Sequence, residues 1–118
     1  MTVKRIVANI ATAEPGLAQA FYGELFGLTL VMDHGWIQTY AAEAVSGAPQ
    51  VSFASEGGSG APVPELSIEV DDLDAVLARA HAAGHAIAYG PADEPWGVRR
   101  FFLRDPFGRL VNVLAHRG

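Results

Sequence analysis

The sequence predicts an α+β protein built from two similar modules, each with the order strand, helix, strand, strand, strand. Two observations predict this fold class: the order of elements occurs twice, and a Gly- and Pro-rich segment separates the two copies. A shift of 58 residues places Ala13 on Asp71 and Val7 on Glu65, which indicates an internal duplication. Neither module is expected to cover its sheet alone, so the two should pair within the chain or across a dimer.

The first module is expected over residues 1–56. Alternating apolar residues predict a strand over Val3–Ala11, and short strands are expected over 28–32, 36–41 and 50–54. A helix should lie between the first two strands and end at Gly27. Its apolar positions at helical spacing are Leu17, Ala20, Phe21 and Leu25.

The second module is expected over residues 64–118, after a linker over 56–64. A strand over Glu65–Val70 should lead into a helix that Asp71 caps and Gly84 ends, with Asp74 in its first turn. Further strands are predicted over 86–89, 98–103 and 110–114. The last two form a hairpin, because Asp, Pro and Gly at positions 105, 106 and 108 suit a type I turn.

Composition excludes several classes of protein. The chain has 118 residues and no cysteine, which excludes disulfides and thiolate metal sites. A net charge of −5 argues against nucleic acid as a partner. No apolar run approaches the ~20 residues that span a bilayer, and the N-terminus lacks the apolar stretch of a signal peptide. We therefore expect a cytoplasmic protein without a nucleic-acid or membrane partner.

Three segments carry a resemblance to a known family: Phe21–Leu28, Ile68–Asp72 and Phe102–Asn112. With them the chain resembles the vicinal oxygen chelate superfamily of glyoxalases, extradiol dioxygenases and bleomycin-resistance proteins. The likeness covers nearly the whole chain and therefore implies one domain over residues 1–118. It also implies that the two modules form curved mixed sheets around a cleft, paired or swapped in a homodimer.

The resemblance implies metal ligands at four equivalent strand positions. The family's spacing places them at Val7, at Gln50 or Ser52, at Glu65 and at Asn112. Valine has no donor atom, and the family uses Glu where this chain has the neutral Asn112. One carboxylate with amide or hydroxyl partners is a poor site for Zn²⁺, Ni²⁺ or Fe²⁺. We therefore expect no metal and no other cofactor, which disfavours chemistry that depends on a Lewis-acidic ion.

Two polar residues are the leading candidates for the site. In a cleft, Glu65 would act as a general base or bind a cationic group; the alternative is an exposed carboxylate at a strand start. Asn112 lies in an apolar strand and is expected to be enclosed, where it contacts a ligand or a neighbouring strand.

Aromatic and basic residues complete the candidate site. Trp36 and Trp96 suit the walls of a pocket for a planar molecule, and core packing is the alternative. Arg99 and Arg100 should point to opposite faces of a strand, and the one facing the cleft could bind an anionic group. The candidate ligand-binding residues are Trp36, Gln38, Ser52, Glu65, Trp96, Arg99, Arg100, Phe102 and Asn112.

The leading hypothesis is a metal-free protein that binds a small organic ligand, similar to the drug-sequestering bleomycin-resistance branch. The alternative is a lyase, isomerase or dioxygenase of the glyoxalase type, with an atypical site in which Glu65 is the catalytic residue.

Overall fold

The computed structural model describes residues 1–42 and 48–117, which form eight strands and few helices. The α+β fold class predicted from the sequence is confirmed. The chain divides into two compact units, one of residues 7–63 and one that combines residues 1–6 with residues 64–118. Each unit is described by itself below.

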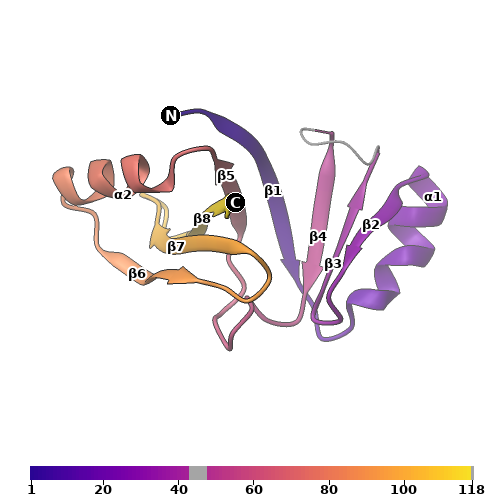
Figure 1. The fold of residues 1–118 in the computed structure, drawn as a ribbon. Helices are drawn as coiled ribbons and strands as arrows, with labels where there is room; N and C mark the ends of the chain where they lie inside the picture. Colours follow the sequence, from indigo (N-terminus) through magenta and orange to yellow (C-terminus); the bar gives the residue numbers. More distant parts are fainter. Residues whose placement is uncertain (43–47, 118) are drawn as a thin grey trace. The chain divides into compact units, whose positions relative to one another are not determined.

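The 7–63 unit contains the continuation of β1 (Val3–Ala11) with β2 (Thr29–Asp33), β3 (Ile37–Ala41) and β4 (Gln50–Ala54), in the order β2-β3-β4-β1 (Figure 1). Strand β1 runs parallel to β4, whereas β3 is antiparallel to both β2 and β4. The core of the unit lies between the helical segment and the sheet, around Ala18, Tyr40 and Phe53.

The helical segment of this unit is irregular. It consists of a 3₁₀ turn η1 (Pro15–Leu17), a π-helical stretch η2 (Gln19–Gly23) and a short α1 (Glu24–Phe26). Gly27 ends it with φ of 71°, as predicted. The regular helix expected from apolar spacing is not formed. The two glycines at positions 16 and 23 offer a physical reason, since glycine disfavours regular helix.

The 64–118 part of the second unit contains β5 (Leu66–Val70), α2 (Leu73–Ala82), β6 (Ile87–Asp93), β7 (Val98–Arg104) and β8 (Leu110–His116). Its strand order is β5-β8-β7-β6, with β5 parallel to β8 and the other pairs antiparallel. Helix α2 covers one face of this sheet. The buried core there consists of Val70, Leu73, Phe101, Val111 and Val113.

Two details of this unit differ from the prediction. The N-cap of α2 is Asp72, whose Oδ1 accepts from the N–H of Ala75 at 3.1 Å, and not Asp71. Strand β6 is longer than predicted, because Gly90 and Pro91 sit in register shifts along the strand and do not end it. Gly90 has φ of 80°, and a Cβ there would lie 2.6 Å from the carbonyl oxygen of Arg100.

The predicted hairpin forms as expected, with the N–H of Gly108 donating to the carbonyl of Asp105 at 3.1 Å.

The two modules also resemble each other in the register of their strands. In the first unit Ser52 lies beside Asn9 and Thr39, and in the second Asn112 lies beside Ser67 and Phe102. Each module therefore places a polar residue of its last strand next to one of its first strand.

Among the described residues, no helix has the length and apolar character needed to cross a bilayer.

The start of the chain is attached to the second unit at Asp71. The N–H of Thr2 donates to Asp71 Oδ1 at 2.7 Å, and the carbonyl of Thr2 accepts from the N–H of Asp71 at 3.1 Å. The first of these bonds lowers the pKa of the Asp71 carboxyl below its ordinary value of 3.8. The ionised carboxylate therefore stabilises the fold above that value, and this contribution disappears as the pH falls through the lower folded pKa.

We expect Asp71→Asn to lower the free energy of unfolding at pH 7, because it removes the charge that holds the Thr2 N–H. The difference from the unsubstituted chain should shrink as the pH falls below about 3.8, where the carboxyl becomes protonated. Urea unfolding between pH 7 and pH 2.5 measures both quantities. A difference that stays constant over this range would contradict the assignment.

Candidate functional site

The two faces of the second unit's sheet carry different side chains. Because side chains alternate along a strand, the residues between those packed on α2 lie on the other face. That face combines hydrogen-bonding and aromatic groups, and we call it the polar–aromatic face. The residues after which it is named are Ser67, Glu69, Tyr89, Arg100, Phe102 and Asn112, with Trp96 packed on Arg100 from the loop before β7. The buried apolar residues Val98, Leu110 and Leu114 lie on the same face.

Asn112 occupies the middle of this face and is 7% exposed. Its Nδ2 donates to Ser67 Oγ at 3.1 Å, as the register of β5 and β8 allows. Its Oδ1 is buried and has no hydrogen-bond partner among the described residues. A buried carbonyl without a donor costs about 1–3 kcal/mol, so native proteins rarely leave one. The Asn112 Oδ1 atom is therefore an unused acceptor on this face.

Of the two neighbouring arginines at positions 99 and 100, Arg100 is the buried one, with 3% of its side chain exposed. Its Nε donates to Glu94 Oε2 at 2.8 Å, and Glu94 is itself buried. The guanidinium carbon lies 5.2 Å from the ring centroid of Tyr89, 4.9 Å from Trp96 and 4.8 Å from Phe102. The charge of Arg100 is thus neutralised by Glu94 and enclosed by aromatic rings.

Arg99 points the other way and lies at the surface, where it pairs with Asp93 at 3.3 Å and approaches Asp74 at 3.8 Å. The expectation that the two arginines take opposite faces is consistent with this placement. The sequence could not say which one would be enclosed.

Glu69 and Glu94 are buried carboxylates that sequence reasoning did not select. Glu69 Oε1 lies 2.6 Å from Arg5 Nε, and its Oε2 lies 3.6 Å from Nε2 of the exposed His116. For Glu69 a signal existed, since it lies between Ile68 and Val70 in an apolar strand. For Glu94 the loop sequence before Trp96 offers no such pattern.

Glu65, the predicted catalytic residue, lies immediately before β5 with about half of its side chain exposed. Its carboxylate pairs with Arg109 Nη1 at 3.1 Å, and its N–H donates to the carbonyl of Leu110 at 2.8 Å. The structure therefore places Glu65 at the exposed start of the strand that carries Ser67.

Three other predicted residues belong to the 7–63 unit. Ser52 is buried and shares a hydrogen bond of 2.7 Å with the hydroxyl of Thr39. Gln38 accepts a hydrogen bond from the Tyr40 hydroxyl at 2.7 Å and lies with it on the face that the helical segment covers. The structure therefore places Ser52 and Gln38 on opposite faces of the sheet.

Trp36 stacks on His34, with the ring centroids 6.2 Å apart.

Burial and, to a smaller extent, the Asp33 carboxylate raise the pKa of the Tyr40 hydroxyl above its ordinary value of 10.0. Tyr40 therefore stays protonated and can donate to Gln38 at neutral pH.

A model of the glyoxalase/bleomycin resistance protein/dioxygenase superfamily matches residues 5–113. The chain belongs to this superfamily. A mycobacterial member, the provisionally named glyoxylase CFP32 of Mycobacterium bovis, is 35% identical over 113 residues, which cover 90% of this chain. The match covers 41% of that relative, so the chain spans well under half of its length.

Solved structures agree on the fold of the superfamily. A Legionella pneumophila chain described as an NAD-dependent benzaldehyde dehydrogenase superposes with a TM-score of 0.73 at 12% identity, covering 95% of this chain and 99% of its own. The methylmalonyl-CoA epimerase of Mycobacterium tuberculosis superposes with a TM-score of 0.62 at 18% identity, covering 98% and 88%. At these identities the likeness shows the fold alone.

The donor groups at the four positions that the resemblance assigns to metal ligands do not fit a transition metal. Val7 is buried and has no donor atom, and Glu65 is exposed and paired with Arg109. Ser52, or Gln50 as the alternative at the same position, and Asn112 offer only a neutral hydroxyl or neutral amides. Within residues 1–42 and 48–117, no three His, Cys, Asp or Glu side chains gather to hold an ion.

The buried Glu94–Arg100 pair and the exposed Glu65–Arg109 pair should differ sharply in their effect on stability. We expect Glu94→Ala to lower the free energy of unfolding by about 3–5 kcal/mol, because it leaves the buried Arg100 charge unpaired. Glu65→Ala, the matched control at an exposed pair, should cost about 0–1 kcal/mol. Equilibrium denaturation measures both, and equal losses would show that Arg100 does not depend on Glu94.

Proposed function

We propose that this chain is a metal-independent member of the superfamily that binds a small organic ligand on its polar–aromatic face, in the manner of the drug-sequestering branch. The observation that carries this proposal is the buried Asn112 Oδ1 without a donor. An unmet acceptor in a buried position is costly unless a water molecule or a ligand supplies the missing N–H or O–H group, and we assign that role to a ligand.

The surrounding residues limit the ligand further. Tyr89 and Trp96 lie beside Arg100 and are partly exposed, which suits a planar organic molecule, whereas Phe102 is fully buried. Glu94 already neutralises Arg100, so the face offers no free positive charge to a strongly anionic group. We therefore expect a largely aromatic ligand with at least one hydrogen-bond donor aimed at Asn112.

A second candidate function is a lyase or isomerase reaction in which a carboxylate accepts a proton. It is favoured by the provisional glyoxylase name of CFP32 and by the epimerase among the structures of the same fold. Glu65 and Glu69 both belong to the segment that carries Ser67, and Glu69 is the buried one. In this function the ligand would leave the protein chemically changed.

We expect Asn112→Leu to abolish binding of aromatic or glycopeptide antibiotics, bleomycin among them, while the free energy of unfolding stays within about 1 kcal/mol. The substitution removes an unsatisfied carbonyl and one hydrogen bond, which largely offset each other. Ser52→Ala is the matched control in the other module. It should cost about 1–3 kcal/mol, because the buried Thr39 hydroxyl loses its partner.

Titration calorimetry measures antibiotic binding, and urea unfolding measures the free energy of unfolding. Mass spectrometry of the recovered ligand separates ligand sequestration from the enzyme reaction. Unchanged ligand supports sequestration, and a converted ligand supports the enzyme. No saturable binding across the panel, or full binding by Asn112→Leu, would contradict the proposed site.

We further propose that the chain acts as a homodimer, as the resemblance implies. Leu25 and Phe26 are 63% and 62% exposed, and large apolar side chains at this exposure are typical of surfaces that another chain covers. Light scattering should give twice the chain mass of 12.5 kDa. A single-chain mass over a hundredfold range of concentration would contradict it.

A further inference from the structure

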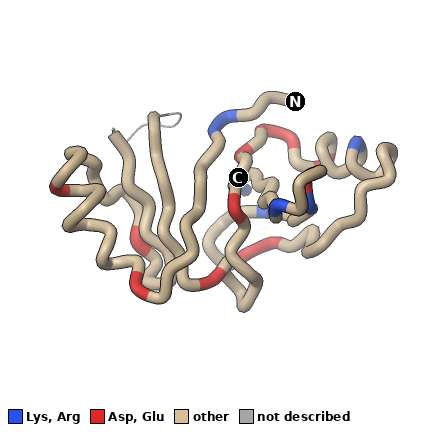
Figure 2. Tube along the Cα trace, turned by 180° about the vertical axis from the view of Figure 1, so that it is seen from behind, with Lys and Arg blue, Asp and Glu red and all other residues tan. Residues whose placement is uncertain are grey.

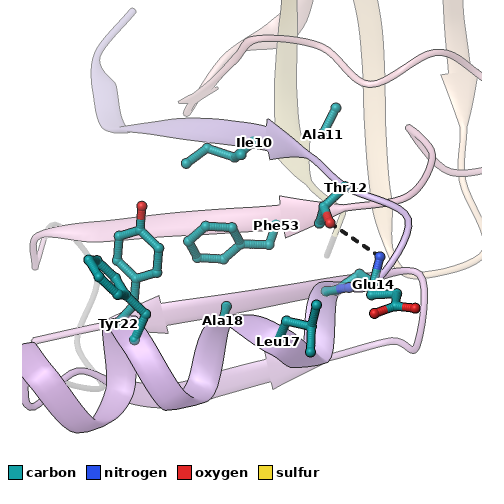
Figure 3. Close-up of a pocket in the computed structure, with 10 residues that line it drawn as sticks. Ile10, Ala11, Thr12, Glu14, Leu17, Ala18, Tyr22 and Phe53 are labelled. Atoms are coloured by element: carbon teal, nitrogen blue, oxygen red, sulfur yellow. Dashed lines mark hydrogen bonds between the residues drawn. The ribbon is translucent and has the colours of Figure 1, made fainter.

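A cavity lies in the 7–63 unit, on the face of its sheet that the helical segment covers. It has a volume of about 360 Å³, within the range of small-molecule pockets. Figure 3 shows its side chains, which come from the end of β1, from β4 and from the segment after residue 14. Most of them are apolar, including Ile10, Leu17, Ala18, Phe21, Tyr22 and Phe53.

The fold itself does not require this opening. In the other module, the regular helix α2 covers the sheet and leaves Leu73 and Ala80 at 5% and 6% exposure. Here the irregular η1–η2 segment leaves Leu17 and Phe21 at 69% and 54% exposure. A π-helical stretch within a helical segment often marks a functional site. Two modules of the same topology thus differ in whether their helical face is closed.

One wall of the pocket is aromatic. The rings of Tyr22 and Phe53 lie 4.7 Å apart between centroids, and those of Phe21 and Tyr22 lie 5.0 Å apart. Aromatic faces attract cations as well as apolar groups. The rim carries Glu14, the single ionisable carboxylate among the lining residues, and no described Lys or Arg lies within ion-pair distance of it.

The charge of the chain is segregated between the units. The sequence from residue 7 to residue 63 contains no Lys or Arg, and its five acidic residues equal the net charge of −5. All eight Lys and Arg residues belong to the other unit, where eight acidic residues balance them. Lys and Arg are drawn blue in Figure 2. An uncompensated negative unit attracts cations and repels anions at any apolar site it carries.

We propose that this pocket is a second ligand site, and that it takes a hydrophobic organic cation of one or two rings. The apolar body lies against Tyr22 and Phe53, and the ammonium group lies near Glu14. The site shares no residue with the polar–aromatic face, so it does not depend on the function proposed above.

The test uses three probes of equal length: 4-phenylbutylamine, the neutral 4-phenylbutan-1-ol and the anionic 4-phenylbutyrate. We expect the amine to shift the backbone amide signals of Ile10, Ala18, Tyr22 and Phe53 in a ¹⁵N-labelled sample. It should bind about two- to fivefold more tightly than the alcohol at low salt, since an exposed ion pair contributes modestly. The ratio should approach one in ~1 M salt, and the carboxylate should bind most weakly.

Matched variants locate the site. Glu14→Gln should remove the preference for amine over alcohol, whereas Glu24→Gln, the same charge change on the same segment, should keep most of it. Phe21→Ala should weaken all three probes at least threefold, whereas Phe107→Ala, at an exposed phenylalanine of the other unit, should not. Asn112→Leu should leave amine binding unchanged whether or not the polar–aromatic face binds its own ligand.

Three results would overturn the proposal. The first is equal affinity for amine, alcohol and carboxylate at low salt. The second is a set of amide shifts confined to residues outside the pocket. The third is pocket signals that move with protein concentration and not with amine, which would assign the surface to a second copy of the chain.

Discussion

The parallel pairing of the first and last strands within each module is the constraint on which the other features depend. It places β1 beside β4 and β5 beside β8, so that side chains more than 40 residues apart in sequence become neighbours. The hydrogen bond from Asn112 to Ser67 exists because of this register. A slip of one residue would turn Asn112 onto α2 and expose Val111 and Val113 on the other face.

The same alternation explains how one sheet can both fold and carry a polar site. Residues facing α2 form a closed apolar core around Phe101, which is fully buried. Their neighbours on β7 include Arg100, whose burial is tolerated because Glu94 and three aromatic rings surround it. An enclosed ion pair of this kind contributes little net stability but fixes the positions of the groups around it. Tyr89 and Trp96 are held against the sheet in this way.

Much of the architecture could be predicted from the sequence, because turn chemistry and period-two alternation are local signals. The hairpin around Asp105 and the helix end at Gly27 are of this kind. The prediction of a regular helix after residue 15 is wrong, because it rests on apolar spacing and gives too little weight to two glycines. Strand alternation predicts that Arg99 and Arg100 point to opposite faces of the sheet, but it cannot tell which of these faces packs against α2.

The candidate site was harder to predict for a related reason. Gln38 and Ser52 are both predicted as ligand-binding residues, but the strand register sets them on opposite faces. Glu94 becomes a buried partner through a loop whose path no short pattern encodes. The burial of Asn112 is predictable, because its neighbours in the strand Leu110–Leu114 are apolar. Its hydrogen bonds could not be predicted, because they depend on which side chains the tertiary structure brings close. Nδ2 donates to Ser67 of β5, whereas Oδ1 has no partner among the described residues.

The segregation of charge has a practical consequence for the chemistry of the chain. Lys4 is the single lysine, and the next basic residue after Arg5 is Arg79. Trypsin therefore leaves residues 6–79 as one peptide, with the whole first helical segment inside it. Acetylation and ubiquitination of lysine side chains, like reagents that couple to them, are confined to Lys4. The acidic unit can be labelled through its carboxylates but not through lysine amines.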